Sequence, residues 1–305
     1  MPSPRITVVG SSNFDLFSRP PRFPKPGETL IGGEFRTDFG GKGANQAVTA
    51  ARLGAQVTMV SSVGRDVFGQ RMLENYAAQG IDTRYVLVDE TRASGVADIW
   101  VDDGGQNVII ISPGANMALT PQHVGLASEV IQGAAAVVCQ LEVPVAAVME
   151  AFRIARAAGV RTILNTAPAA PIPDELIALS DILSPNETET ELLTGRPVDS
   201  LDDVAEAARS LLARGAQTVV VTLGKRGALL VQPDTVHHVP PTRVQAVDTT
   251  GAGDAFIGAL AVFLGEGQSL TQAIEWANIV AGVSVTRRGT QASFPYRAEL
   301  AAQLG

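Results

Sequence analysis

The sequence predicts an α/β fold with a mostly parallel central sheet, helices on both of its faces and a small extra layer of strands. Short runs rich in β-branched residues alternate along the chain with longer stretches rich in Ala and Leu. Such alternation is typical of a parallel sheet that is buried on both faces. Two segments, residues 14–38 and 94–112, break the rhythm. We therefore expect a single domain over residues 1–305, in which these two segments form a β-sheet lid over the mouth of the main sheet.

The strands are predicted from short apolar runs rich in Val and Ile, beginning with RITVVG at residues 5–10. Runs of this length and composition are typical of buried strands. Ligands of such sheets bind beyond the carboxyl ends of the strands, so residues that follow a strand are candidates for a site. The strands that we expect are residues 5–10, 56–62, 135–140, 161–165, 217–222, 226–231 and 235–239.

The helices are predicted from longer Ala- and Leu-rich stretches that have start and stop signals. Gly54 and Gly80 each follow such a stretch, and Gly is the usual residue just past the end of a helix. Ser269 and Gln272 have the spacing of a capping box, which predicts a helix start. The helices that we expect are residues 42–53, 66–79, 145–158, 200–214, 252–264 and 269–285.

The two irregular segments have a different composition. Residues 14–38 are rich in Pro, Gly and Phe and have no helical period. Residues 94–101 and 107–112 read as strands, and the Asp-Asp-Gly-Gly turn between them is a hairpin signal. A lid that excludes water is one interpretation of these segments, and ordinary loops with an edge hairpin are the other.

Composition excludes several classes of protein. Hydrophobic residues make up 46% of the 305 residues and charged residues 18%, which excludes a disordered chain. The net charge of −8 argues against nucleic acid or an anionic membrane as a partner, because both select basic surfaces. The sequence shows neither a secretory signal nor an apolar stretch long enough to span a bilayer. The one cysteine, Cys139, lies in an apolar run and fits a small buried hydrophobe. We expect a cytoplasmic globular protein.

The best-known phosphate-binding motifs are absent. A P-loop needs Gly-Lys followed by Ser or Thr, but Gly41-Lys42 is followed by Gly43, and Gly224-Lys225 by Arg. The first predicted strand lacks the Gly-x-Gly-x-x-Gly of dinucleotide-binding folds, and the protein-kinase motifs are missing as well.

A different anion site is predicted at DTTGAGD, residues 248–254, which precedes the apolar helix AFIGALAVFL. Gly251 and Gly253 leave backbone N–H groups accessible at the start of this helix, where the helix dipole favours negative charge. Asp254, in the first turn, can accept a proton from a hydroxyl group while the N–H groups stabilise a phosphoryl group. The dipole should lower the pKa of Asp254. A plain helix cap with Gly packing is the alternative.

Three more stretches carry polar groups beside predicted strand ends or helix starts. FGGKGANQ, residues 39–46, lets the backbone approach a polyol, or forms only a tight turn before a helix. Asn13 and Asp15 follow the first strand, where they contact a ligand or form an Asx turn. Asn186 either caps a short helix or, with Glu189, orients water around Mg²⁺.

Taken together and in this order, these stretches resemble the ribokinase (PfkB) family of carbohydrate kinases. The resemblance extends from the first strand to Ser293. It rests on GGKGANQ at residues 40–46 and DTTGAGD at residues 248–254, supported by SPNE at 184–187 and VTLG at 221–224. It implies the ribokinase-like three-layer α/β/α fold and transfer of the γ-phosphoryl group of ATP to a sugar.

The resemblance also implies a role for each matching residue. Asp254 corresponds to the catalytic base, and Gly251, Ala252 and Gly253 to the anion hole. The sugar-binding positions are Asn13, Asp15, Gly41, Lys42, Gly43, Asn45, Glu142 and Asp254. The positions that bind ATP and Mg²⁺ are Asn186, Glu189, Thr222, Gly224, Lys225, Gly227, Gly253 and Asn278. The positions around a K⁺ ion, mostly through backbone carbonyls, are Asp248, Thr250, Ser284, Arg287, Gly289 and Ser293.

The substrate that the resemblance implies is D-ribose, phosphorylated on its 5-hydroxyl. Asn13, Asp15 and the strand of residues 95–101 leading to GAN at 114–116 look more like ribokinases than like adenosine kinases or fructokinases. A related kinase for 2-deoxyribose, fructose or a nucleoside is one alternative. A non-catalytic sugar or nucleotide sensor is another, although the intact Gly-Ala-Gly-Asp254 counts against it. We also expect a homodimer through the lid strands, because an open β layer leaves edges that a second copy can cover.

Overall fold

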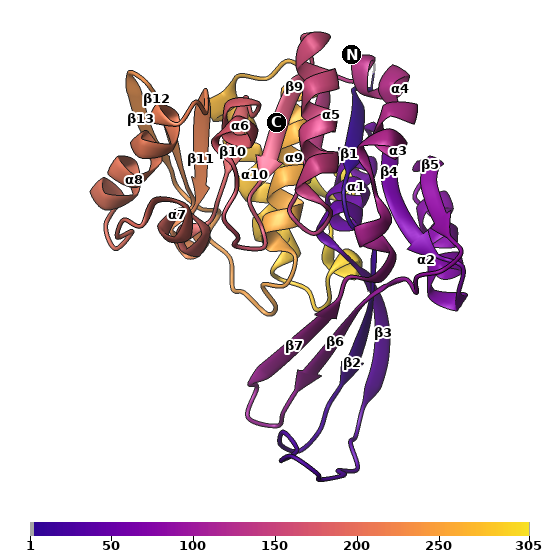
Figure 1. Ribbon diagram of the computed structural model, residues 1–305. Coiled ribbons are helices and arrows are strands. Elements are labelled where there is room, and N and C mark those ends of the chain that lie inside the picture. Colours follow the sequence, from indigo (N-terminus) through magenta and orange to yellow (C-terminus); the bar gives the residue numbers. More distant parts are fainter. Residues whose placement is uncertain (1–2, 305) are drawn as a thin grey trace.

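The computed structural model describes residues 3–304 and confirms the α/β class, with a large sheet between helices and a small sheet that projects from one end (Figure 1). The large sheet has nine strands in the order β13-β12-β11-β10-β9-β8-β1-β4-β5. All neighbours are parallel except β12, which is antiparallel to both β11 and β13. The chain therefore builds most of the sheet by strand–helix–strand crossovers, as the alternation in the sequence predicts.

The elements have the following bounds. The strands of the large sheet are β1 (Arg5–Val9), β4 (Gln56–Gly64), β5 (Asp82–Asp89), β8 (Ala136–Cys139), β9 (Arg161–Asn165), β10 (Ile182–Ser184), β11 (Thr218–Thr222), β12 (Ala228–Gln232) and β13 (Thr235–Val239). The α-helices are α1 (Lys42–Arg52), α2 (Val67–Ala78), α3 (Pro121–Leu126), α4 (Ser128–Gln132), α5 (Val145–Ala157), α6 (Asp174–Ala178), α7 (Glu187–Thr194), α8 (Leu201–Ala213), α9 (Ala252–Gly265), α10 (Leu270–Ser284) and α11 (Ala301–Leu304). The 3₁₀ helices are η1 (Gly114–Ala118), η2 (Gly224–Arg226), η3 (Gln291–Ser293) and η4 (Arg297–Leu300).

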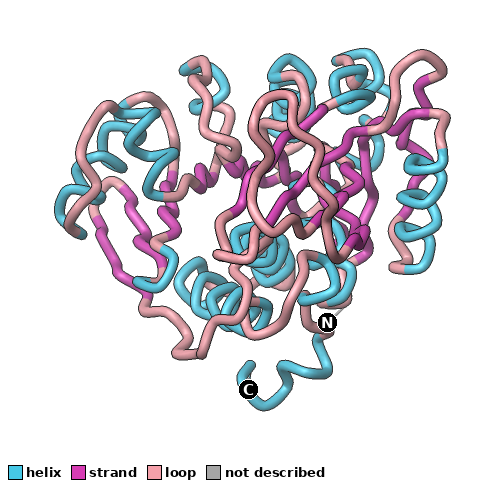
Figure 2. Tube along the Cα trace, turned by 90° about the horizontal axis from the view of Figure 1, so that it is seen from below, coloured by secondary structure: helices cyan, strands magenta, loops and turns pink. Residues whose placement is uncertain are grey.

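Two hydrophobic cores lie on opposite faces of the large sheet, with helices beyond each of them (Figure 2). Along β1, Ile6 and Val8 face the core formed with α1, α9 and α10, and Val9 faces the core formed with α3, α5 and α8. Neighbouring side chains of a strand point to opposite faces, so a strand covered on both sides is mostly apolar, and the buried Thr7 on β1 donates its hydroxyl to the Val130 carbonyl. Cys139 is buried in the second core, as expected of a small hydrophobe.

The parallel strands end at one edge of the sheet, and this edge positions the candidate site. β1 ends at Val9, β8 at Cys139 and β9 at Asn165. Farther along the sheet, β10 ends at Ser184 and β11 at Thr222. Polar loops follow each of these residues, and α1 and α9 begin beside them. The polar groups that the sequence marks after its strands are thereby brought to the same end of the molecule.

The small sheet is connected to the body at this edge of the large sheet. Its strands are β2 (Asn13–Ser18), β3 (Phe35–Gly40), β6 (Gly95–Val101) and β7 (Asn107–Ser112), in the order β3-β2-β6-β7. β2 is antiparallel to β3 and parallel to β6, and β6 and β7 form the predicted hairpin. The two irregular segments of the sequence thus meet in one sheet, which extends away from the body (Figure 1). Among the described residues, no helix has both the length and the apolar character needed to cross a membrane.

Local details differ from the expectation at two points. Ser269 caps α10 by accepting from the N–H of Gln272, but the Gln272 side chain donates to Glu275 instead of returning to the cap, so the predicted capping box is wrong. The strand expected from residue 226 begins only at Ala228, because residues 224–226 form η2 and Gly227 has a φ of 89°.

Candidate active site

Asp254 lies in the first turn of α9, and amide groups hold both oxygens of its carboxylate. Asn45 donates from Nδ2 to Oδ2 over 2.8 Å, and Gln46 donates from Nε2 to Oδ1 over 3.1 Å. Both amides come from α1, which packs against α9. Asp254 is only 7% exposed, so its carboxylate is nearly enclosed, and the two amides hold it in one orientation. This arrangement suits a group that accepts a proton at a defined point.

The pKa of Asp254 is raised, which corrects the expectation that the helix dipole would lower it. Burial of the carboxylate is the largest cause, and the charge of Lys42 together with the hydrogen bonds from Asn45 and Gln46 opposes it. The dipole effect is worth a fraction of what desolvation costs a charge that is nearly enclosed. A raised pKa makes Asp254 a stronger base than an exposed aspartate.

Lys42 and Glu142 bring further charges to the same place. Burial disfavours the charged form of Lys42, but the carboxylates of Asp254, Glu142 and Glu189 outweigh burial and raise its pKa. Glu142 follows β8, and its Oε2 accepts from the backbone N–H of Lys42 over 2.9 Å and from the Ser11 hydroxyl over 2.5 Å. Lys42 thus lies among three carboxylates from different parts of the chain, which keeps it charged inside the site.

The start of α1 is pressed against the loop after β1, and its glycines make this possible. A Cβ atom at Gly41 would lie 2.7 Å from the backbone nitrogen of Asn13, and one at Gly43 would lie 2.6 Å from that of Ser11. Gly41 also has a φ of 86°, which side chains rarely adopt. Any larger residue would therefore push the loop after β1 away from α1.

Asn13 and Asp15 lie on β2, where the small sheet joins the body. The Asn13 side chain accepts from Asn116 Nδ2 over 2.7 Å, so it is fixed by η1. Burial, reinforced by the charges of Asp38, Glu142 and Asp254, raises the pKa of Asp15 to about 8. Asp15 is therefore mostly protonated at pH 7 and can donate as well as accept a hydrogen bond there. That property suits a site for a polyol.

Asn186 and Glu189 lie farther along the strand ends, at the start of α7. They form a capping box, in which the Glu189 carboxylate accepts from the backbone and side-chain nitrogens of Asn186 at 2.9 Å. Glu189 also accepts from the Thr166 hydroxyl, and burial raises its pKa. These contacts occupy the carboxylate, which suits water-mediated contact with a metal ion better than direct ligation. Both the cap and the site interpretation of the sequence therefore fit the same two residues.

The residues expected around the nucleotide border the next strand ends. Thr222 ends β11 and donates its N–H to the Pro185 carbonyl over 2.9 Å, next to Asn186. Gly224 and Lys225 form η2, and a Cβ at Gly227 would lie 2.2 Å from the Val239 carbonyl oxygen. Asn278 on α10 donates to the Pro240 carbonyl over 3.1 Å. It thereby ties α10 to the segment that follows β13.

The residues expected around a cation lie in two loops that hydrogen-bond to each other, except Ser284, which is the buried last residue of α10 and donates to the Ala281 carbonyl over 2.8 Å. Asp248 accepts from the N–H and hydroxyl of Thr250 and, over 3.0 Å, from the N–H of Gly289. Ser293 donates to the Thr290 carbonyl over 2.8 Å, and the Arg287 side chain turns outward to pair with Glu299. No cluster of three or more His, Cys, Asp or Glu side chains suits a metal ion within residues 3–304. A cation here would depend on carbonyl oxygens and Asp248, a donor set that fits an alkali ion better than a transition metal.

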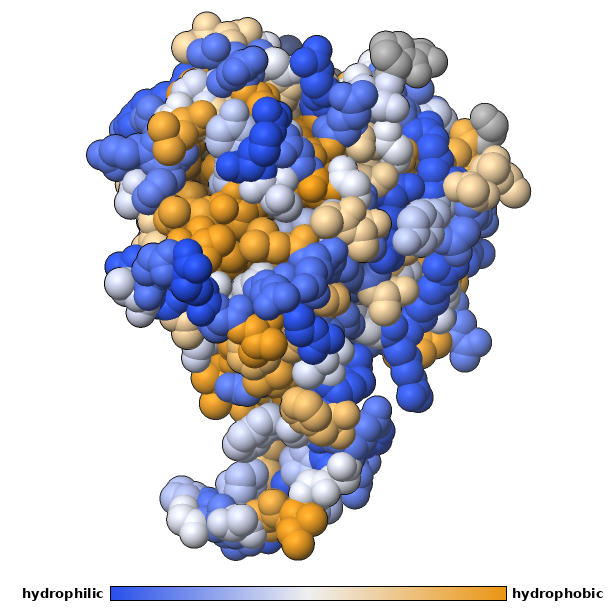
Figure 3. Space-filling view, turned by 90° about the vertical axis from the view of Figure 1, so that its right-hand side faces the viewer, coloured by the Kyte–Doolittle hydropathy of each residue, from blue (hydrophilic) through white to orange (hydrophobic). Residues whose placement is uncertain are grey.

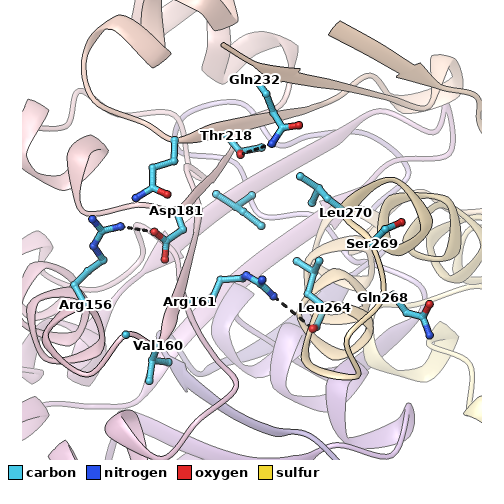
Figure 4. A pocket seen from close by; sticks show the side chains of 13 residues that line it. Arg156, Val160, Arg161, Asp181, Thr218, Gln232, Leu264, Gln268, Ser269 and Leu270 are labelled. Carbon is cyan, nitrogen blue, oxygen red and sulfur yellow. Dashed lines mark hydrogen bonds and ion pairs between the residues drawn. The ribbon is translucent and has the colours of Figure 1, made fainter. Parts of the chain in front are cut away.

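A separate cavity of about 690 Å³ lies at the opposite end of the large sheet (Figure 4). Its lining includes Arg161, Ile182 and Thr218, the first residues of β9, β10 and β11. The candidate residues follow the last residues of the strands instead. This cavity is therefore distinct from the candidate active site.

The sequence interpretation missed several buried amides of the site. Gln46 and Gln291 contact Asp254 and Asn45, respectively, and Gln140 donates to Gln46 over 2.6 Å. Asn165 accepts from Gln46 over 3.2 Å. Their positions in the sequence could have identified three of them, because Gln46 ends the predicted motif of residues 40–46, and Gln140 and Asn165 end predicted strands. Gln291 had no such signal.

The chain resembles known proteins over nearly its whole length. Residues 3–297 match the family described as pfkB family carbohydrate kinase. The chain is 45% identical over 300 residues to a ribokinase of Mus musculus, covering 97% of this chain and 93% of that protein. It is 43% identical over 291 residues to a deoxyribokinase of Salmonella typhi, covering 95% of each.

A solved structure has the same fold as this chain. The structure of Arabidopsis thaliana ribokinase complexed with ribose and ATP superposes with a TM-score of 0.95 at 34% sequence identity, covering 99% of each chain. The likeness extends over both sheets, since almost no residue of either chain is left unmatched.

Proposed function

Because this chain belongs to the pfkB family of carbohydrate kinases, we propose that it transfers the γ-phosphoryl group of ATP to the 5-hydroxyl of D-ribose, giving D-ribose 5-phosphate and ADP. The enzyme is then a phosphotransferase with an alcohol group as acceptor. The observation that carries the proposal is the Asp254 carboxylate, held by two amides at the start of α9. Relatives called ribokinases, 40–45% identical over nearly the whole chain, support D-ribose as the sugar.

Asp254 acts as the general base in this proposal. It takes the proton of the sugar hydroxyl as the sugar oxygen bonds to the γ-phosphorus and the bond from that phosphorus to ADP breaks. Such transfers pass through a loose transition state, so positioning and charge stabilisation contribute more than base strength. Gly251 provides no side-chain cap for α9, and the Ala252 N–H donates to the Thr249 carbonyl over 3.2 Å, so we assign the transferring group to the other N–H groups of this turn, such as that of Gly253.

The sugar and the nucleotide occupy neighbouring parts of the strand edge. The groups proposed for the sugar hydroxyls come from three parts of the chain: Asn13 and Asp15 from β2, Lys42 and Asn45 from α1, and Glu142 from the loop after β8. The positions proposed for ATP lie mostly at or after the ends of β10 and β11 (Asn186, Glu189, Thr222, Gly224, Lys225 and Gly227), with Gly253 on α9 and Asn278 on α10. Lys42 links the two parts, because the charges of both Asp254 and Glu189 act on it.

Two ions complete the proposal. Mg²⁺ arrives with ATP and neutralises phosphate charge, with Glu189 acting on its water shell. K⁺ would be held between the end of α10 at Ser284 and the loops of Asp248, Thr250, Arg287, Gly289 and Ser293, where it would order the approach to α9. The small sheet acts as a lid that keeps water away from the phosphoryl group. The enzyme works in the cytoplasm.

The test is ADP release from MgATP with D-ribose, 2-deoxyribose, fructose and adenosine in parallel, each with and without K⁺. We expect turnover that is greatest with D-ribose and rises with K⁺. Faster turnover on 2-deoxyribose would favour the alternative that the Salmonella typhi relative suggests. Indifference to K⁺ would contradict the cation site. Tight ribose binding without ADP release on any sugar would favour a sensor.

Dimerisation through the small sheet is a further part of the proposal. β7 lies at the edge of this sheet, and Val108, Ile109, Ile110 and Ile111 on it are 40–54% exposed. An apolar edge strand invites pairing with another chain, and the natural partner is a second copy. Apolar residues reach the surface of the projecting sheet as well as the body (Figure 3).

A substitution on this edge tests the dimer. Light scattering should give about twice the chain mass of 31.8 kDa for the native protein. Ile110→Lys should give the monomer mass, because a lysine on an edge strand opposes pairing. Val236→Lys is the matched control, since Val236 is 40% exposed on β13, an edge strand of the large sheet. A native protein with the mass of one chain would contradict the dimer.

A further inference from the structure

Gln291 is a buried polar residue that connects three parts of the molecule. It begins η3 and is 3% exposed. Its Nε2 donates to Asn45 Oδ1 over 3.2 Å, and its Oε1 accepts from Asn75 Nδ2, on α2, over 2.9 Å. Its backbone carbonyl accepts from Arg52 over 2.5 Å. Gln291 therefore joins η3, α1 and α2 directly behind the residue that contacts Asp254.

The polarity of these contacts fixes the orientation of each amide. A carboxylate only accepts hydrogen bonds, so Asn45 must turn Nδ2 toward Asp254, and its Oδ1 then faces away. Gln291 supplies the donor that this oxygen needs, and Asn75 in turn supplies the donor for Gln291. The contacts form a directed chain from Asn75 through Gln291 and Asn45 to Asp254. The hydrogen bonds within a buried chain of this kind strengthen one another. A buried polar group left without its partner lowers the stability of the folded protein.

A second, shorter chain ends on the other oxygen of the same carboxylate. Gln140 donates to Gln46 Oε1 over 2.6 Å, and Gln46 donates to Asp254 Oδ1. The carboxylate is thus held from two sides by amides that can only be donors where they meet it. The Gln291 chain differs from the Gln140 chain because Asn75 and Gln291 lie neither in a predicted site motif nor at a predicted strand end.

We propose that Gln291 is a positioning residue for the phosphoryl transfer, which keeps the Asn45 amide turned so that its Nδ2 faces the Asp254 carboxylate. This inference rests on the proposed role of Asp254 as base. Without the donor at position 291, the buried Asn45 Oδ1 loses its partner, and the amide is held only by its hydrogen bond to Asp254. Asn45 then turns to find a new partner for its oxygen, which lengthens and weakens the hydrogen bond from Nδ2 to the carboxylate.

Gln291 also connects the base to the loop proposed to hold K⁺. Gly289, two residues earlier, donates to Asp248, and Ser293, two residues later, donates to Thr290. A shift of this loop would move Gln291 and loosen the Asn45 amide. The chain of amides thus gives the loop a physical route to the base.

The predicted consequence is a change in the protonation of Asp254. Lys42, Glu142, Asp15 and Glu189 are the charged or titratable groups that act on Asp254, and Gln291→Met leaves all of them in place. The hydrogen bond from Asn45 lowers the pKa of Asp254 against the effect of burial, so its loss raises that pKa. A base must be ionised, so activity should need a higher pH.

The experiment is the pH profile of kcat for the native enzyme and for Gln291→Met, with D-ribose and MgATP. In Gln291→Met the acid limb of the profile should move to higher pH by about one unit. At pH values on the acid limb, kcat of the variant should be about tenfold lower than that of the native enzyme, and at high pH the difference should become smaller. Thermal unfolding and ribose binding by calorimetry are measured on the same samples. Gln79→Met is the matched control, because Gln79 accepts from Arg52 over 3.0 Å but does not touch Asn45.

The outcomes separate this inference from the proposed function. A native enzyme without turnover on any sugar removes the function and this inference with it. An active native enzyme with an unchanged acid limb in Gln291→Met overturns the inference alone, even if the variant melts earlier. If Gln291→Met does not fold, Asn75→Leu, one step farther from Asp254, must shift the limb in the same direction by a smaller amount. An unchanged limb in Asn75→Leu then overturns the inference.

Discussion

Asp254→Asn is expected to lower kcat for D-ribose by about a thousandfold, while the protein still folds and binds ribose. The substitution removes the carboxylate that accepts the hydroxyl proton in the proposed mechanism. It keeps the size of the side chain, so the sugar site changes little. Initial rates of ADP release, with ribose binding measured by calorimetry, test the expectation. Near-normal turnover would show that the proton goes elsewhere.

The hydrogen bonds of the site add a second reason for the loss. Asn45 and Gln46 both donate to Asp254, and an asparagine at this position accepts on one oxygen only. One of the two amides then faces another N–H group and must turn. Asp254→Ala avoids that conflict and should be as inactive, so both variants together distinguish loss of the base from disorder of the amides. Asp203→Asn, in the exposed cap of α8, is the control and should keep full activity.

The layout of this site follows from the sequence to a large extent, and the reasons are local. The strands β1, β8 and β9 are short apolar runs, and each is followed at once by the polar residues of the site. Parallel strands bring such residues to one edge whatever the intervening loops contain. The strand β10 was not predicted because Ile182–Ser184 is too short to have a period.

Buried amides and shifted pKa values could not be predicted in the same way. Nothing in the sequence separates Gln291, which is buried, from Gln268 or Gln272, which are not. Its burial results from η3 packing against α1 and α2, which are more than 200 residues away in the chain. The raised pKa of Asp254 also results from burial by distant parts of the chain. The sequence shows that Asp254 lies at a helix start, but it does not show that other elements bury the carboxylate.

Gly253→Val is expected to lower kcat by about a hundredfold or more without destabilising the protein, because the space next to Gly253 is open. A Cβ atom at Gly253 would meet no heavy atom within 4 Å, whereas one at Gly251 would lie 2.9 Å from Thr290 Cγ2. Gly251 also has a φ of 76°. Gly251 is therefore required by packing and backbone conformation, and Gly253 is required by neither.

The open space above the first turn of α9 is where the transferring phosphoryl group must lie if the N–H groups there stabilise its charge. A branched side chain at Gly253 fills this space and covers the N–H groups, and valine is tolerated in a helix at least as well as glycine. Gly253→Ala fills less of the space, so its kcat should fall between those of the native and valine enzymes. Gly125→Val on α3, where a Cβ atom also meets nothing within 4 Å, is the matched control. Turnover by Gly253→Val equal to that of Gly125→Val, at equal ribose affinity, would place the phosphoryl group away from α9 and leave Asp254 without its proposed partner.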